Sequence, residues 1–182
     1  MRSIGCPTVQ VLGVVNVTPD SFSDGGRYLD HDAALTHARA LVAQGAHWID
    51  VGGESTRPRA DPVSEAEELR RVLPVVEALA AQGVATSIDT RKAGVAEAAV
   101  AAGARMINDV SASLGAVAAA TGAAFVAMHM RGDPTTMQQD PRYDDVVAEV
   151  RDYLVARAAA ARAAGVAVLW VAPAIGFATT LY

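Results

Sequence analysis

The chain has a single cysteine, Cys6, among its 182 residues. One cysteine cannot form a disulfide within the chain, and it has no cysteine partner for a zinc cluster. Residues 1–7 also lack the apolar stretch of a secretory signal peptide. These features exclude a disulfide-stapled secreted domain, and we expect the protein in a reducing compartment, the cytoplasm.

An excess of either charge is also missing. Charged residues make up 19% of the chain, with acidic and basic residues interspersed and a net charge of −5. This balance excludes the basic surface that non-specific nucleic-acid binding requires. Hydrophobic residues make up 52% of the chain, which excludes a disordered protein and suffices for a single domain over residues 1–182.

Two uncharged stretches, residues 111–130 and 163–182, are long enough to cross a membrane. The first is interrupted by two glycines and His129, and the second by Pro173 and Gly176. Both combine Ala-rich with β-branched segments, which is typical of a buried strand beside a helix. We therefore expect no membrane span and no membrane partner.

Apolar runs and helical patterns alternate about six times, at intervals of roughly 20 to 40 residues, as in a parallel sheet covered by helices. The predicted strands are residues 9–15, 47–53, 84–90, 105–111, 124–130 and 166–171. The predicted helices are residues 32–45, 64–79, 92–102, 114–121 and 144–164, the second opening on a capping box of Ser64 and Glu67.

Two architectures agree with this alternation, a doubly wound open sheet and a (β/α)8 barrel of the TIM type. Polar residues follow nearly every predicted strand, as they do when one carboxyl-terminal rim builds the site. A doubly wound sheet more often has a glycine-rich phosphate turn after its first strand, and no G-x-G-x-x-G is present. We therefore predict an incomplete TIM-type barrel, with about six βα units present.

The first strand end carries the most informative polar stretch. Asn16 and Asp20 supply oxygens that a hard cation or a polar heterocycle can use, and Pro19 ends the strand. An Asx-rich turn with solvated side chains is the alternative for any one such stretch. Similar strand ends recur along the chain, and this recurrence favours a binding site.

Five motifs in chain order resemble dihydropteroate synthase, from about Val9 to Gly176. They are residues 16–26 (NVTPDSFSDGG), 52–58 (GGESTRP), 87–90 (SIDT), 108–110 (NDV) and 128–130 (MHM). The resemblance implies a transferase of folate biosynthesis and a target of sulfonamides. Its reaction condenses 6-hydroxymethyl-7,8-dihydropterin diphosphate with p-aminobenzoate, using Mg²⁺.

The resemblance also implies roles for residues of the pterin half of the site. Asn16 is the expected Mg²⁺ ligand, a neutral amide oxygen suited to a cation that the diphosphate mostly neutralises. Asp89 and Asn108 are expected to bind the pterin, whose edge presents adjacent donors and acceptors. Thr56 is expected to contact the pterin diphosphate and Met128 to line the pterin slot.

The loops after the first two strands are expected to form the aminobenzoate pocket. The resemblance assigns this pocket to Phe22, Ser55, Arg57 and Pro58. It assigns Asp24 the catalytic role of stabilising the cation that remains when diphosphate departs. Asp20 and Asp24 can exchange these roles. His129 is expected to be a satisfied buried histidine and not a general base.

The sequence departs from the family pattern at its end. In residues 172–180 (APAIGFATT), Ala172 replaces the pterin-binding aspartate and Thr179 replaces a lysine. The chain stops at Tyr182, before a later basic motif, about two strands of the barrel and the helices that form the family's homodimer.

We therefore predict weak or no synthase activity for this chain alone, since losing these contacts weakens binding by about 5 kcal/mol. The alternative is a non-enzymatic relative that binds a pterin or a partner chain. A relative that binds a reduced folate for methyl transfer is disfavoured, because the aminobenzoate-loop motifs are present.

Overall fold

The structure, a computed structural model, describes residues 9–18, 31–55, 62–132 and 142–175. Strands and helices alternate throughout these residues. In chain order they are β1 (Leu12–Asn16), α1 (His31–Ala43), β2 (Trp48–Gly52), α2 (Glu65–Ala81), β3 (Thr86–Asp89), α3 (Ala93–Ala101), β4 (Met106–Asp109), α4 (Gly115–Thr121), β5 (Ala124–Met128), α5 (Val146–Ala164) and β6 (Leu169–Ala172).

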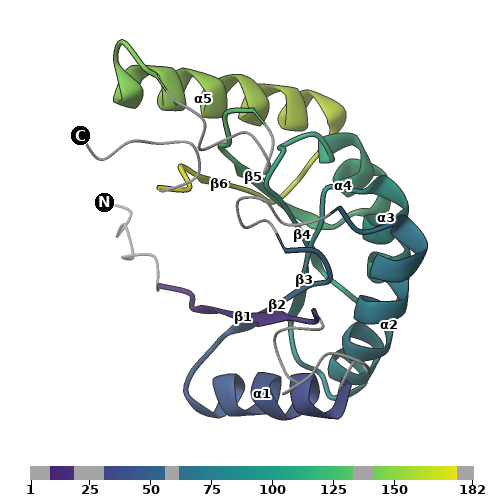
Figure 1. The fold of residues 1–182 in the computed structure, drawn as a ribbon. Coiled ribbons are helices and arrows are strands. Elements are labelled where there is room, and N and C mark those ends of the chain that lie inside the picture. The colour runs from purple at the N-terminus through teal and green to yellow at the C-terminus, as the bar shows by residue number, and fades with distance from the viewer. Residues whose placement is uncertain (1–8, 19–30, 56–61, 133–141, 176–182) are drawn as a thin grey trace, which may run out of the picture.

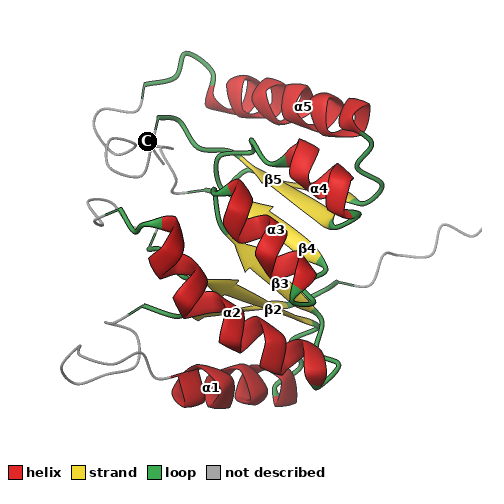
Figure 2. Ribbon diagram, turned by 90° about the vertical axis from the view of Figure 1, so that its right-hand side faces the viewer, coloured by secondary structure: helices red, strands yellow, loops and turns green. Residues whose placement is uncertain are grey.

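All neighbouring strands pair in parallel, and their order in the sheet is their order in the sequence, from β1 to β6. The order of a doubly wound sheet reverses at a switch point, whereas the wall of a (β/α) barrel runs sequentially. The sheet curls strongly, with the helices on its convex side (Figures 1 and 2). The prediction of a partial TIM-type barrel is confirmed.

A tryptophan pair measures how far the sheet curls. The rings of Trp48 in β2 and Trp170 in β6 meet edge to face, with their centroids 6.1 Å apart. In the sheet these two strands are separated by β3, β4 and β5. The two tryptophans therefore face each other across the concave side of the sheet.

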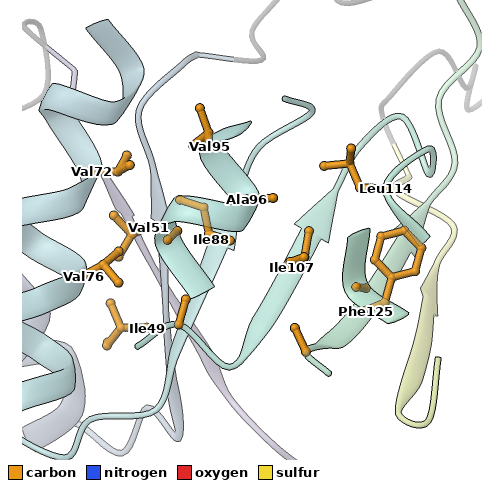
Figure 3. Packing of buried hydrophobic residues seen from close by; sticks show 14 of the residues in the cluster. Ile49, Val51, Val72, Val76, Ile88, Val95, Ala96, Ile107, Leu114 and Phe125 are labelled. Atoms are coloured by element: carbon orange, nitrogen blue, oxygen red, sulfur yellow. The ribbon is translucent and has the colours of Figure 1, made fainter. Parts of the chain in front are cut away.

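The main core lies between the convex face of the sheet and the helices (Figure 3). Strand residues such as Ile49, Ile88 and Phe125 are fully or almost fully buried there, against helix residues such as Val76 and Val95. Each such side chain contributes about 1.5 to 3 kcal/mol of hydrophobic stabilisation. Because side chains alternate along a strand, the remaining strand residues project to the concave face.

Two helices begin at side-chain caps, of which the Ser64 cap was predicted and the Asp145 cap was not. The Ser64 hydroxyl accepts the backbone N–H of Glu67 at 3.3 Å, and the Asp145 carboxylate accepts that of Ala148 at 3.0 Å. The reciprocal half of the capping box is not made, because the Glu67 carboxylate binds Arg70 and Arg71 on the next turn instead. In the part of the chain that the structure describes, no helix combines the length and the apolar character needed to span a membrane.

Two strands begin three residues later than predicted. The first begins at Leu12 rather than residue 9, and it is only half-buried, with Val14 52% exposed. This strand is an edge of the described sheet, with a paired neighbour on one side only. The last begins at Leu169 rather than residue 166, because the backbone N–H of Val166 still closes helix α5 onto Ala161 at 3.1 Å.

Candidate active site

At the ends of four neighbouring strands, three of the predicted site residues lie in the same register of the sheet. Asn16 of β1 pairs in register with Gly52 of β2, Gly52 with Asp89 of β3, and Asp89 with Asn108 of β4. Parallel strands that share a register place equivalent side chains on the same face. The structure thus brings Asn16, Asp89 and Asn108 together on the concave face, as predicted.

Gly52 leaves the space that two of these side chains occupy. A Cβ atom on Gly52 would lie 3.3 Å from Oδ1 of Asn16 and 3.5 Å from Oδ2 of Asp89. Both oxygens therefore converge over the same glycine. A side chain at this position would stand between the amide of β1 and the carboxylate of β3.

Asp50 is a further buried polar residue beside the site that sequence reasoning missed. It is 3% exposed, and its Oδ2 accepts a hydrogen bond from Nδ2 of Asn108 at 2.8 Å. Among the described residues, the other amide atom, Oδ1 of Asn108, is buried without a hydrogen-bond partner. A carboxylate in the middle of the apolar run 47–53 was the signal in the sequence that could have identified Asp50.

The pKa of Asp89 lies well above its ordinary value of 3.8. Burial is the main cause, followed by the negative charges of Asp50, Glu68, Asp109 and Glu54. Burial also raises the pKa of Asp50, although neighbouring hydrogen-bond donors partly oppose it. A ligand that donates N–H groups here would stabilise the charged carboxylate of Asp89.

Replacing Asp89 with asparagine is expected to stabilise the unliganded protein at neutral pH. A raised pKa means that the folded state binds the proton more tightly than the unfolded state, so the wild type loses stability as the pH rises above 3.8. The Asp89→Asn variant has no such loss. Urea unfolding across the acidic to neutral range should give curves that coincide at low pH and diverge as the pH rises; a less stable variant at neutral pH would contradict this.

An ion network fixes the start of the loop after β2. The Glu54 carboxylate binds Arg91 at 2.7 Å and also Lys92, which in turn binds Glu68. Thr90, directly after Asp89, donates its hydroxyl to Glu68 at 2.7 Å. The network therefore links the end of β2 to the end of β3.

The charges in this network shift one another's pKa values. Burial acts to raise the pKa of Glu54, but hydrogen bonds and charges from Lys92 and Arg91 outweigh it and hold the pKa below 4.5. Burial acts to lower the pKa of Lys92, but Glu54 and Glu68 outweigh it and raise the value. Both groups therefore remain charged at neutral pH.

Of the other predicted site residues, the structure describes Met128 and Ser55. Met128 packs against Val110 and Met130 and is the register partner of Ala172 in β6. Ser55 is partly buried, directly after Glu54 of the ion network. Thr56, Phe22, Arg57, Pro58 and Asp24 lie outside the described residues, as do Asp20 and Thr179.

Two polar residues of the motifs serve the helix layer instead of the site. The Asp109 carboxylate accepts the backbone N–H groups of Ser113 and Leu114, at 2.6 and 2.8 Å, and so holds the entry to α4. His129 is 4% exposed and stacks edge to face on Tyr153, with ring centroids 5.2 Å apart.

His129 is thus buried as expected, but it is not fully satisfied within the described residues. Its Nδ1 atom has no hydrogen-bond partner among them. Burial and the nearby Arg131 charge lower the pKa of His129. The neutral imidazole is therefore favoured at this position.

Asn16 offers a suitable but incomplete ligand set for Mg²⁺. Its amide oxygen projects toward Gly52 at the site, and amide oxygens are acceptable ligands for this hard cation. Within the described ranges, no three His, Cys, Asp or Glu side chains form a metal-binding cluster. Asn16 could supply one ligand to a magnesium ion, beside the phosphate and water oxygens that this cation prefers.

Comparison with known proteins agrees with this site. Residues 12–181 match the family model of the pterin binding enzymes. Dihydropteroate synthase of Mycobacterium leprae is 51% identical over 94% of this chain, and the chain spans 63% of that relative's length.

Solved structures show the same relationship. Yersinia pestis dihydropteroate synthase, in complex with a sulfonamide drug, superposes with a TM-score of 0.87 at 46% identity, over 94% of this chain and 65% of that one. Xanthomonas albilineans dihydropteroate synthase, in complex with 7,8-dihydropteroate, gives a TM-score of 0.81 at 45% identity, over 94% and 62% of the two chains. With its sequential parallel sheet and the convergence of Asn16, Asp89 and Asn108, the chain belongs to the pterin-binding enzyme family and is homologous to dihydropteroate synthases.

Proposed function

We propose that this chain binds 6-hydroxymethyl-7,8-dihydropterin diphosphate and serves the synthesis of 7,8-dihydropteroate from this substrate and p-aminobenzoate. The observation that carries the proposal is the shared register of Asn16, Asp89 and Asn108 on the concave face. A pterin ring presents adjacent N–H donors and acceptors along one edge. Burial deprives the charged carboxylate of Asp89 of water, and N–H donors of a ligand would replace the lost hydrogen bonds.

Asn16 is the residue proposed to hold Mg²⁺ together with the diphosphate of the substrate. When bound, this cation would neutralise the leaving group while the C–O bond to diphosphate breaks. The amine nitrogen of p-aminobenzoate forms the new C–N bond and loses a proton. We assign the p-aminobenzoate contacts to Phe22, Ser55, Arg57 and Pro58, the diphosphate contact to Thr56 and stabilisation of the developing cation to Asp24.

Ala172 favours a second candidate function, pterin binding without turnover. It lies at the end of β6, in register with Met128, at the position where the family pattern has an aspartate. One missing charged hydrogen bond costs about 1.5 to 3 kcal/mol, or about 10- to 150-fold in affinity. We therefore expect the isolated chain to bind the pterin weakly and to have little or no synthase activity.

The two functions are separated by measuring binding and turnover on the same protein. Calorimetric titration with the pterin diphosphate is expected to show weak binding that Mg²⁺ strengthens. The Asn16→Ala variant should lose the strengthening by Mg²⁺ and keep the binding of diphosphate-free 6-hydroxymethylpterin. Dihydropteroate formation at a rate typical of enzymes would exclude the second function, and absence of any pterin binding would refute both.

A further inference from the structure

We propose that Asp50 is a positioning residue of the pterin site, which fixes the amide of Asn108 so that its oxygen faces the ligand. The inference rests on the proposed pterin binding. Asp50 lies in the middle of β2 and none of the motifs assigns it a role. Its carboxylate and the amide of Asn108 are joined by a 2.8 Å hydrogen bond between neighbouring layers of the concave face.

The first step of the argument concerns the direction of this hydrogen bond. An ionised carboxylate only accepts hydrogen bonds, whereas an amide has one end that donates and one that accepts. With Asp50 ionised, turning the amide over would place its oxygen against Oδ2 of Asp50, two acceptors with no hydrogen between them, whereas the observed orientation pairs Oδ2 with Nδ2 of Asn108. Asp50 therefore selects one of the two amide orientations of Asn108.

The second step concerns the atom that is left over. With Nδ2 of Asn108 bonded to Asp50, its Oδ1 is buried and has no partner among the described residues. A buried acceptor without a partner is unfavourable, so a ligand that donates a hydrogen bond to it is expected to bind about 5- to 150-fold more tightly. Asn108 thus presents an acceptor only, beside the acceptor carboxylate of Asp89.

The consequence is a preference for one kind of ring edge. A ligand edge with adjacent N–H donors satisfies both Asn108 and Asp89, whereas an edge without donors leaves both oxygens unpaired. Asparagine at position 50 would lose this control, because its own amide can accept from or donate to Asn108. We therefore expect the Asp50→Asn variant to bind pterins more weakly and with less discrimination.

The hydrogen bond itself can be tested in the wild-type chain without any substitution. The chain contains only two asparagines, Asn16 and Asn108, so asparagine-selective ¹⁵N labelling gives two side-chain amide groups. With ¹³C-labelled aspartate carboxyls added, one of the two should show a scalar coupling to an aspartate carboxyl carbon across the hydrogen bond. The Asn16→Gln variant should retain that coupling, and its absence from the wild type would overturn the proposal.

The effect on binding is measured with two probes, 6-hydroxymethylpterin and an analogue whose 2-amino group is dimethylated. The Asp50→Asn variant is expected to bind the first about tenfold more weakly and to discriminate against the second less than the wild type does. The matched control is Asp109→Asn, which alters a buried carboxylate next to Asn108 that faces the helices. This control should lower stability and leave the ratio of the two affinities unchanged.

The outcomes distinguish the inference from the function on which it rests. If the wild type binds neither probe, the proposed function fails. If the wild type binds and discriminates, and the Asp50→Asn variant has the same ratio of affinities, only the role of Asp50 is refuted. A changed ratio in the Asp109→Asn control would likewise refute it, because a general loss of stability would then explain the result.

Discussion

The Ala172→Asp variant is expected to bind 6-hydroxymethylpterin about 10- to 150-fold more tightly than the wild type, the energy of one charged hydrogen bond. Residue 172 ends β6 and is the register partner of Met128, on the same face of the sheet as Trp170. A carboxylate there would face the site from the side opposite Asn16. It would add an acceptor for a ligand donor that Asp89 and Asn108 leave free.

The matched control for this gain is Val171→Asp. Val171 precedes Ala172, is 49% exposed and lines the convex side of β6 together with Val150 and Leu154 of α5. The control adds the same charge one residue away, on the opposite face of the strand. Calorimetric titration should show no gain in the control, and equal affinities for Ala172→Asp and the wild type would contradict the proposed pterin site.

The Lys92→Met variant is expected to lose about 3 kcal/mol or more of unfolding free energy at neutral pH, as when one partner of a buried ion pair is removed. Lys92 bridges Glu54 and Glu68, and the Glu68 side chain is only 1% exposed. Glu54 would keep Arg91 as a partner. Among the described residues, Glu68 would keep the neutral hydroxyl of Thr90 as its partner, and its buried carboxyl group would lose the compensating cation.

The pH dependence of this loss has a definite sign. The depressed pKa of Glu54 contributes stability that is present above pH 4.5 and is lost as the pH falls through the folded-state value. Part of that contribution comes from Lys92 and is absent in the variant. Urea unfolding should therefore show the largest difference between the two proteins above pH 4.5, and a smaller one in more acidic solution.

An exposed ion pair provides the control for Lys92→Met. Arg151 binds Asp152 at 2.8 Å, with both side chains about two-thirds exposed, at 65% and 68%. The Arg151→Met variant removes the same kind of charge from a solvated pair and should cost far less unfolding free energy than Lys92→Met. A comparable loss in both variants would show that burial of the network around Glu68 does not determine the effect.

Much of the fold could be predicted from the sequence because its local patterns agree with one another. The run 84–90 contains the observed strand β3. The helix predicted at residues 92–102 ends before Gly103, whose φ of 115° does not fit a continuing helix. The strand ends could not be predicted as closely, because apolar residues extend beyond the hydrogen-bonded part of a strand. Val166 is apolar and buried, yet its backbone completes the end of α5 rather than the start of β6.

Site residues could be predicted where a motif residue lies at the end of a strand. They could not be predicted where the face on which a residue is buried decides its role. Asn108 and Asp109 are adjacent in one motif, and the sequence alone could not separate them. Alternation along β4 sends Asn108 to the concave face and Asp109 to the helix layer, where its carboxylate holds the turn before α4. Asp50 was not predicted as a site residue, because its hydrogen-bond partner Asn108 is far away in the sequence. The two residues meet because β2 and β4 lie on either side of β3 in the sheet.

The sequence by itself determined the alternation of strands and helices, the polar strand ends and the resemblance to a pterin-binding family. These features depend on short-range periodicity and on residue types, which a chain displays without folding. Only the tertiary structure decided the sequential parallel order, the curl that brings Trp48 to Trp170 and the orientation of the Asn108 amide. Each of these depends on contacts between residues far apart in the chain, and register and burial set such contacts once the sheet has formed.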